Sequence, residues 1–371
     1  EQEKARAKDL ASWDLTQRQL CDIDLLLNGA FSPLEGFLGR EDYDAVCRDM
    51  RLASGVLWPI PITLDVSEAF AGALEAGQVI ALRDPEGVIL ALMTVTDKWR
   101  PNKAREAEKV FGADDDTHPA VNYLHNTAGK VYLGGPVTGI QQPVHYDFKG
   151  RRDTPNELRA YFRKLGWRKV VAFQTRNPMH RAHEELCRMA YNDVKADGIL
   201  IHMLLGKLKP GDIPADVRDA AIRKMVEVYF PPNTVMVTGY GFDMLYAGPR
   251  EAVLHAVFRQ NMGATHLIVG RDHAGVRGYY GTYDAHYIFD EFDDAAIDIT
   301  PLFFDHAFYC KKCGAIVSAK TCPHDQSNWV HLSGTQVREM LERGEMLPAE
   351  FTRPEVSKVL IEGMLRKKQE G

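Results

Sequence analysis

The densest group of reactive side chains in this 371-residue chain lies between residues 174 and 183. It combines amide, hydroxyl, guanidinium and imidazole groups, on Gln174, Thr175, Arg176, Asn177, His180 and His183. A guanidinium is a planar cation with five donors, which suits a tetrahedral oxyanion. Histidines three residues apart share one face of a helix. A surface pair at a helix start would have the same spacing, but this many polar groups together favours a ligand site, because buried polar groups need partners.

The flanking sequence predicts the elements that position this group. The apolar run 170–173 is typical of a short buried parallel strand, and apolar residues recur at helical spacing between 186 and 190. Residues 174–180 are therefore expected to form a strand-to-helix turn. At such a turn the carboxyl end of the strand faces a crevice, and the free N–H groups of the helix attract anions. Phosphate or sulfate is the expected type of ligand.

A second reactive group is a cluster of thiols near the end of the chain. Cys310-x-x-Cys313 is followed by Cys322 and His324. Three thiolates and an imidazole at this spacing suit a closed tetrahedral Zn²⁺ site of the structural kind. Reduced free thiols are the alternative. For the fourth ligand, His331 is a second candidate beside His324.

Strands and helices alternate through the middle of the chain. The expected strands are 169–174, 199–205, 234–239, 266–270 and 297–303, and the expected helices are 181–195, 215–229, 249–262 and 284–291. Such alternation is typical of a doubly wound parallel sheet. The block 270–273 follows one strand as the block starting at 174 follows another. We expect the two blocks to meet at the carboxyl edge of the sheet.

The remaining sequence predicts two further domains around this α/β unit. Strands at 61–66, 78–82 and 87–96, with helices near 41–50 and 101–112, indicate a β-rich, barrel-like unit. The last part carries the thiol cluster and helices near 335–343 and 354–368. We therefore predict an α/β protein of three domains: the β-rich domain 1–153, the α/β domain 154–303, and the small cluster-bearing domain 304–371.

Four segments together resemble the ATP sulfurylase family. They are Gln174-Thr-Arg-Asn-Pro-Met-His-Arg-Ala-His183, Gly270-Arg-Asp-His-Ala-Gly275, Leu332-Ser-Gly-Thr335 and Asn28-Gly-Ala-Phe-Ser-Pro-Leu-Glu-Gly-Phe37. The first is similar to a longer form of the His-x-Gly-His motif of nucleotidylyltransferases, with Ala182 at the usual glycine. The segments occur in family order and cover nearly the whole chain. The resemblance is to the bacterial monofunctional type with a zinc-binding cluster.

The resemblance implies the reaction of MgATP and sulfate to adenosine 5′-phosphosulfate and pyrophosphate, by direct displacement at the α-phosphorus. It implies that sulfate is bound by Gln174, Arg176 and the backbone N–H of Ala274. It implies that ATP is bound by Gln174, Thr175, Arg176, Asn177, His180, His183, Gly270, Arg271, Asp272 and His273, and that Thr175, Arg176, Asn177, His180 and His183 are catalytic. It also implies the nucleotide-binding role of the α/β domain and a homodimer or other small homo-oligomer.

Composition limits the partners. With a net charge of −6, nucleic acid is not expected as a partner, so an anion site must be a local basic pocket. No apolar stretch is long enough for a membrane span, and no secretory signal is evident, so a cytoplasmic protein with reduced Cys21, Cys47 and Cys187 is expected. No Gly-x-x-x-x-Gly-Lys-Ser/Thr segment occurs, so the P-loop kinase domain of bifunctional family members is not expected.

Several alternatives stay open at this stage. Residues 207–212 are either a solvated loop or a lid over the phosphates, and residues 244–251 match the family but also make structural sense as a helix start at Pro249. Two rival functions are an adenylyltransferase with another acceptor and a non-enzymatic zinc-bearing interaction protein. The physiological direction, assimilation or sulfur oxidation, is also open, as are protein ligands of Mg²⁺.

Overall fold

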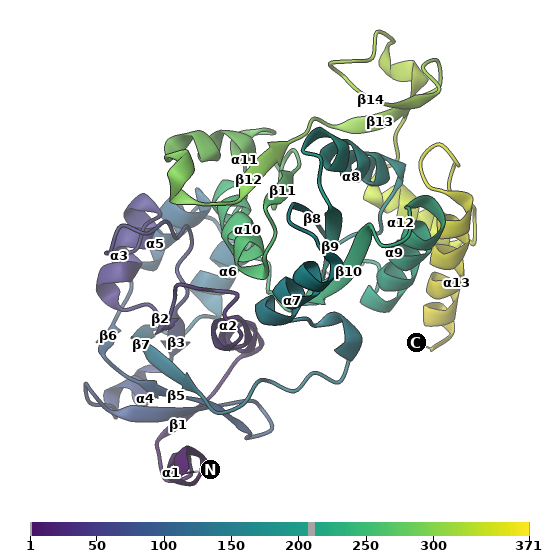
Figure 1. The fold of residues 1–371 in the computed structure, drawn as a ribbon. Helices are drawn as coiled ribbons and strands as arrows, with labels where there is room; N and C mark the ends of the chain where they lie inside the picture. Colours follow the sequence, from purple (N-terminus) through teal and green to yellow (C-terminus); the bar gives the residue numbers. More distant parts are fainter. Residues whose placement is uncertain (1, 207–211, 371) are drawn as a thin grey trace.

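The computed structural model of this protein describes residues 2–206 and 212–370 (Figure 1). The possible lid at 207–212 lies outside the described residues except for Asp212. A β-rich part (purple to blue) and a part built on a parallel sheet (teal to green) lie side by side in Figure 1, and a small hairpin projects from the second part. None of the described helices is long and apolar enough to cross a membrane.

The N-terminal part is a curled seven-stranded sheet, which confirms the predicted β-rich domain. Its strands are β1 Ser12–Asp14, β2 Gly36–Phe37, β3 Leu64–Val66, β4 Val79–Arg83, β5 Ile89–Thr94, β6 Asp97–Trp99 and β7 Val131–Gly139. The path runs β1-β4-β5-β7-β2, while β3 and β6 also pair with β7. The predicted strands at 61–66 and 87–96 are shorter in the structure than expected.

Strand β7 is the hub of this sheet and was not predicted from the sequence. It pairs with β2, β3, β5 and β6, all antiparallel. Glycines weaken the strand signal, yet here they are required by close approach. A Cβ on Gly135 would lie 1.9 Å from the Thr94 carbonyl oxygen, and one on Gly134 would lie 2.5 Å from Gly39 Cα.

Short helices surround this sheet. They are α1 Gln2–Ala7, α2 Gln17–Leu27, α3 Arg40–Asp49, α4 Glu68–Gly72, α5 Lys103–Glu106 with a π-helical turn Ala107–Phe111, and α6 Pro119–Asn126. The helices predicted near 41–50 and 101–112 are therefore present, whereas α2 and α6 were not predicted. Helix α2 begins in a capping box, in which the Thr16 side chain accepts from the Gln19 N–H and Gln19 Oε1 accepts from the Thr16 N–H.

The second part is a five-stranded parallel sheet, as predicted. Its strands are β8 Val170–Thr175, β9 Gly198–Leu204, β10 Val235–Tyr240, β11 His266–Val269 and β12 Thr300–Phe303, in the order β10-β9-β8-β11-β12. The order reverses between β8 and β11, so this pair is the topological switch point, where ligands bind in open α/β sheets. Both reactive blocks follow these two strands.

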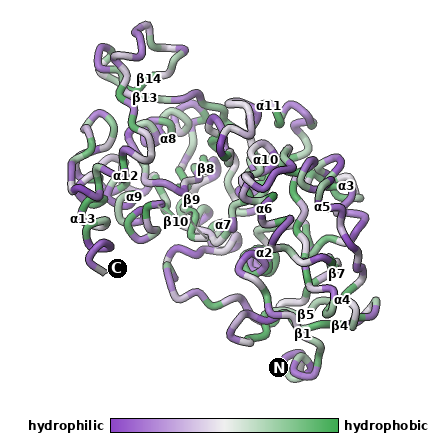
Figure 2. Tube along the Cα trace, turned by 180° about the vertical axis from the view of Figure 1, so that it is seen from behind, coloured by the Kyte–Doolittle hydropathy of each residue, from purple (hydrophilic) through white to green (hydrophobic). Residues whose placement is uncertain are grey.

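Helices cover both faces of this sheet. They are α7 Pro155–Leu165, α8 Arg181–Asp193, α9 Ala215–Tyr229, α10 Pro249–Met262 and α11 Asp284–Tyr287, which continues as a 3₁₀ turn Ile288–Glu291. Alternate residues of β8 serve different cores. Val170 and Ala172 pack with α7, α10 and the N-terminal part, whereas Val171 and Phe173 pack with α8 and α9. The connection at 140–154 is mostly hydrophilic (Figure 2).

The last part of the chain contributes to the second core and to the hairpin. Strands β13 Ala307–Cys310, β14 Ala315–Ser318 and β15 Trp329–Val330 form an antiparallel sheet, which is followed by α12 Gly334–Glu342 and α13 Pro354–Glu370. Residues of α12 and α13 share a core with β8, β9 and α9. The hairpin β13–β14 projects from the body near α8 (Figure 1). The predicted boundaries at 153/154 and 303/304 stay predictions.

Candidate active site

A cavity of about 440 Å³ opens at the switch point between β8 and β11. Its volume is in the range of small-molecule sites. Both reactive blocks contribute to its wall, as do the first turn of α8 and the segments around β13 and β15. The lining residues that belong to these blocks are Gln174, Asn177, Pro178, His180, Ala182, His183, Gly270, Arg271 and His273.

The turn after β8 is held by its own polar groups. The Thr175 hydroxyl donates to the Asn177 carbonyl oxygen at 2.6 Å and accepts from the Asn177 N–H at 3.1 Å. Thr175 is buried, so this closed pair of hydrogen bonds satisfies its hydroxyl and fixes the path of the turn. Thr175 does not line the cavity, and its position is that of a support for the turn.

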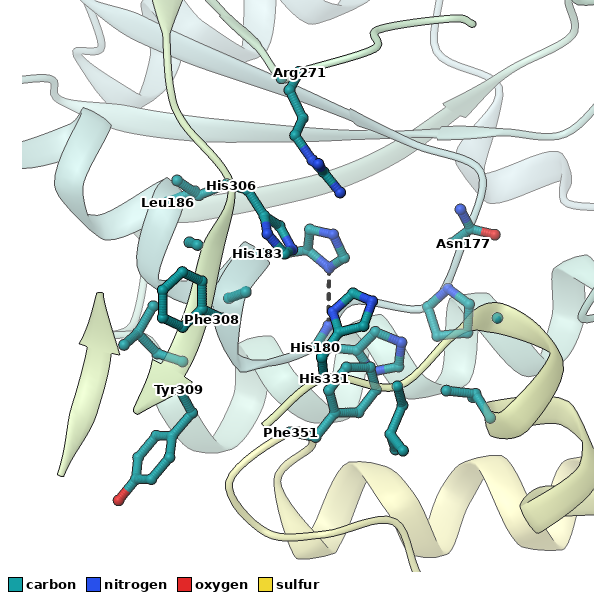
Figure 3. Close-up of a pocket in the computed structure, with 18 of the residues that line it drawn as sticks. Asn177, His180, His183, Leu186, Arg271, His306, Phe308, Tyr309, His331 and Phe351 are labelled. Carbon is teal, nitrogen blue, oxygen red and sulfur yellow. Dashed lines mark hydrogen bonds between the residues drawn. The ribbon is translucent and has the colours of Figure 1, made fainter. Parts of the chain in front are cut away.

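His180 and His183 lie together at the start of α8, as their spacing predicts. The His180 N–H donates to His183 Nδ1 at 3.1 Å (Figure 3). His180 Nδ1 lies 2.7 Å from the Thr352 hydroxyl. Burial, and then the nearby His183, lowers the pKa of His180 to about 3. Burial, and then His306, lowers the pKa of His183 to about 4. Both rings are therefore neutral hydrogen-bonding groups near pH 7.

Two further histidines line the cavity that sequence reasoning did not assign to it. His306 precedes β13 and His331 follows β15, and their ring centroids lie 5.4 Å apart. Burial, followed by the positive charge of Arg271 and by His331, lowers the pKa of His306 to about 4. Figure 3 shows the Arg271 side chain extending toward His183 and His306. No sequence signal linked His306 to the block at 174, because only the fold brings them together.

Arg176 and the residues near it lie outside the wall of this cavity. Its guanidinium carbon lies 5.1 Å from the centre of the Tyr246 ring, and Arg176, Asp272 and Ala274 do not line the cavity. Among the described residues, the buried atoms Gln174 Oε1 and Arg176 Nη1 have no hydrogen-bond partner. Unpaired buried polar groups are costly, so this pair next to the turn is a candidate contact for a small oxyanion. A half-turn of the Gln174 amide would present its NH₂ group to such an anion.

The loop of the second block adopts unusual backbone conformations. Asp272 and Ala274 both have positive φ, at 48° and 54°. The Ala274 carbonyl oxygen accepts from the Gly248 N–H at 3.2 Å, which joins this loop to the start of α10. Left-handed backbone at non-glycine residues is strained, and such strain is typical of functional loops. Burial raises the pKa of Asp272, while the charges of Arg271 and Arg176 oppose this rise.

The four predicted metal ligands form one cluster at the hairpin. The ligand atoms of Cys310, Cys313, Cys322 and His324 all lie within 4.8 Å of one another. His324 Nδ1 lies 3.5 Å, 3.3 Å and 3.9 Å from the three sulfurs in turn. A tetrahedral site with metal–sulfur bonds of about 2.3 Å has edges of about 3.8 Å, so the donors fit a bound metal. His331 instead lies in the cavity wall.

A parallel sheet with this strand order, a helix start at the switch point, and an arginine beside neutral histidines define a nucleotide-binding α/β protein. Residues 149–363 match the ATP-sulfurylase family model, and residues 1–142 match the PUA-like domain. The chain belongs to the ATP-sulfurylase family and is a nucleotidyltransferase.

Individual relatives agree with this assignment. The chain is 50% identical to the sulfate adenylyltransferase of Symbiobacterium thermophilum, over 97% of this chain and 90% of that protein. It is 48% identical to the sulfate adenylyltransferase of Thiobacillus denitrificans, over 96% and 88%. A solved structure named hexameric APS kinase from Thiobacillus denitrificans matches with a TM-score of 0.74 and 27% identity, over 97% of this chain and 64% of that one.

Proposed function

We propose that the chain is a sulfate adenylyltransferase, which converts MgATP and sulfate to adenosine 5′-phosphosulfate and pyrophosphate. Sulfate adenylyltransferases that are about half identical over nearly the whole chain support this. One structural observation carries the proposal: the turns after β8 and β11, which hold the two family blocks, line one cavity at the switch point. The rival reading as a non-enzymatic interaction protein has no comparable support.

We propose the following roles for the residues of the site. Sulfate is bound near the turn after β8 by Gln174, Arg176 and the backbone N–H of Ala274. ATP is bound by Gln174, Thr175, Arg176, Asn177, His180, His183, Gly270, Arg271, Asp272 and His273, of which Thr175, Arg176 and Asp272 lie beside the cavity and the others line its wall. The catalytic set is Thr175, Arg176, Asn177, His180 and His183. His306 and His331, which share the cavity, are additional contacts for the nucleotide.

The chemistry asks mainly for positioning and charge balance. Two polyanions must approach, with sulfate in line with the α-phosphorus and pyrophosphate leaving on the opposite side. Arg176 and Arg271 supply positive charge. Because burial keeps His180 and His183 neutral, they serve as hydrogen-bond donors to phosphoryl oxygens and do not act as cations. The first turn of α8 adds the positive end of its dipole. Direct displacement needs no covalent intermediate on the protein.

Two metals enter the proposal in different ways. Mg²⁺ arrives with ATP, because it bridges phosphate oxygens, and we assign it no protein ligand. The cluster of Cys310, Cys313, Cys322 and His324 would hold Zn²⁺, since three thiolates and one imidazole suit that ion and leave no open position for catalysis. Its place next to β13 makes it a structural support for the hairpin.

Assembly and location complete the proposal. The solved relative is described as hexameric, which supports a homo-oligomer for this chain, as a dimer or another small assembly. A cytoplasmic location suits a chain with six cysteines that forms a thiolate cluster and has its other three thiols free and buried. The site serves assimilation and sulfur oxidation equally, because the reaction is reversible.

Pyrophosphate release tests the function. Purified protein with MgATP is expected to release pyrophosphate only when sulfate is added, and Arg176→Ala is expected to lower this rate by at least about 10²-fold. The matched control is Arg163→Ala, on the exposed end of α7, which should behave as the original chain. Release without sulfate would favour an adenylyltransferase with another acceptor. No release from folded protein with any acceptor would overturn the enzyme assignment.

A further inference from the structure

Helix α10 carries a line of buried polar side chains that the proposed roles do not use. Glu251, His255 and Arg259 follow one another at intervals of four, so they lie on one face of the helix. Their exposed fractions are 0%, 2% and 0%. Burying such groups costs several kcal/mol each unless they are well paired, and leucines at these positions would pack without that cost. Since their burial is costly, we expect these three side chains to have a role in the site.

Glu251 contacts two backbone N–H groups and the ring of His255. Its two carboxylate oxygens accept from the Leu245 N–H at 3.2 Å and the Ala247 N–H at 2.9 Å. Glu251 Oε1 also lies 3.5 Å from His255 Nε2. Among the described residues, that buried nitrogen makes no hydrogen bond, and its contact with Glu251 is longer than a normal one. A small shift toward the carboxylate would let Nε2 donate its proton there.

The second step joins His255 to the cavity wall. His255 Nδ1 lies 2.9 Å from His273 Nε2, and His273 lines the cavity. Two imidazole nitrogens at this distance share a single proton, so one donates and the other accepts. Burial lowers the pKa of both rings well below the usual value, and the nearby Arg259 lowers both further. Both rings are thus neutral, and each carries one proton.

These facts leave two proton arrangements. With an ionised Glu251, His255 carries its proton on Nε2 toward the carboxylate, its Nδ1 accepts, and His273 carries its proton on Nε2. With a neutral donor at position 251, every proton moves to the opposite nitrogen, and His273 carries its proton on Nδ1. The state of residue 251 therefore decides whether His273 Nδ1, the nitrogen not engaged by His255, accepts or donates a hydrogen bond.

Burial raises the pKa of Glu251, so its carboxylate is mostly ionised only above about pH 7. Two backbone N–H groups and the positive charge of Arg176 oppose burial, which raises the pKa of Glu251 to about 7. The charged and titratable groups that face it are Arg176, Arg259, His255, Tyr240, Tyr246, His118 and Tyr280. Two of these are cations and none is a second carboxylate.

We propose that Glu251 and His255 are positioning residues that hold His273 in one tautomer, with its proton on Nε2 and the lone pair of Nδ1 available to the ligand. The ligand is then expected to offer a donor there, such as a hydroxyl or amino group of a nucleoside, and not a phosphate oxygen. The identity of this ligand rests on the proposed function, whereas the tautomer does not.

Nitrogen NMR of the histidine rings at pH 8 tests the tautomer directly. His273 is assigned by the signal lost in His273→Gln. In the original chain, both His255 and His273 are expected to carry the proton on Nε2, and a coupling across the hydrogen bond should join His255 Nδ1 to His273 Nε2. A proton on His273 Nδ1 would overturn the proposal. This measurement needs no variant of Glu251 and no activity.

The variant Glu251→Gln then tests control by residue 251. Its amide oxygen can accept the shorter hydrogen bond from Ala247. The NH₂ group then takes the place of Oε1, where it gives up the longer bond from Leu245 and faces His255 Nε2. This donor should move the proton of His255 to Nδ1 and that of His273 to Nδ1, two hydrogen bonds away. Binding of ATP without sulfate should weaken by about tenfold, the value of one hydrogen bond.

Glu362→Gln, on the exposed side of α13, is the matched control. It should change neither the tautomer of His273 nor the affinity for ATP. An unchanged His273 tautomer in a folded Glu251→Gln chain would overturn the proposal, even if the chain makes adenosine 5′-phosphosulfate. A tautomer change in Glu251→Gln, together with an original chain that makes no such product, would support the relay and reject the proposed function instead. If Glu251→Gln does not fold, the result for the original chain decides alone.

Discussion

The His180 backbone N–H donates a hydrogen bond to His183 Nδ1 at 3.1 Å, at the first turn of α8. This bond requires a lone pair on Nδ1, so the neutral ring of His183 carries its proton on Nε2. His183 lines the cavity and therefore offers a fixed N–H donor to a bound anion. The helix start thus prepares the ring before any ligand arrives.

The first prediction follows from this donor. His183→Ala should lower kcat by about 10²- to 10³-fold, as expected when one donor to a developing negative charge is lost. His183→Gln should retain more activity than His183→Asn, because a glutamine amide reaches the position of Nε2 and an asparagine amide reaches that of Nδ1. Steady-state rates of pyrophosphate release check both variants, with His125→Gln as a control far from the cavity. Equal loss in Gln and Asn would contradict the donor role.

The second prediction concerns stability at low pH. His180 and His183 stay neutral in the folded chain down to pKa values of about 3 and 4, whereas they take up protons near pH 6.5 when unfolded. The unfolded state therefore binds more protons, and the stability these residues contribute above pH 6.5 is lost as pH falls toward 4. Each histidine should contribute a slope of about 1.4 kcal/mol per pH unit over this range.

Denaturant unfolding at several pH values between 4.5 and 7.5 measures this slope. A His183→Gln chain should show a slope of unfolding free energy against pH that is smaller by about 1.4 kcal/mol per pH unit. The reason is that one buried histidine no longer takes up a proton on unfolding. His125→Gln, which replaces a partly exposed ring at an ion pair, serves as the control. A slope that His183→Gln leaves unchanged would show that His183 is not buried in the neutral form.

The third prediction concerns Arg271 and His306. The charge of Arg271 is a cause, after burial, of the low pKa of His306. Arg271→Gln should therefore raise the pKa of His306 above about 4, although burial should keep it below the usual 6.5. Proton NMR titration of the His306 ring measures this shift, and Arg163→Gln should leave it unchanged. The same variant should raise KM for ATP, since a cation that faces the phosphates is lost.

The fourth prediction separates two neighbouring histidines. His324 lies with the three cysteines, whereas His331 lines the cavity. Elemental analysis should find one zinc per chain in the original protein and in His331→Ala, and much less in His324→Ala. Nucleotide affinity should fall in His331→Ala although its metal is retained. Full metal content in His324→Ala would exclude this histidine as the fourth ligand.

Loss of the metal should also weaken the cavity wall. Pairing of Cys310 with Trp329 and of Tyr309 with Val330 links the cluster to the segments that carry His306 and His331. Chelation should therefore increase hydrogen exchange across residues 304–332 and weaken ATP binding, and added zinc should restore both. The remetallated protein is the control for damage by the chelator.

The sequence by itself determined the elements with strong local signals. The apolar runs of β8, β9 and β11 and the periodic helices between them predicted the parallel sheet, because local burial sets their hydrophobic pattern. The polar block at 174–183 and the spacing of Cys310, Cys313, Cys322 and His324 predicted a ligand site and a metal site. These predictions needed only residues that are neighbours in the chain.

Tertiary structure alone decided which distant residues meet. β7 is the hub of the N-terminal sheet because backbones approach closely at Gly134 and Gly135, and no local signal shows such an approach. His306 and His331 join His183 only through the pairing of β13 with β15 and the packing of β13 on α8. The buried polar side chains of α10 reach His273 only because the loop after β11 packs against this helix, where His255 contacts His273. Contacts of this kind depend on register and packing between segments far apart in sequence, which residue spacing does not encode.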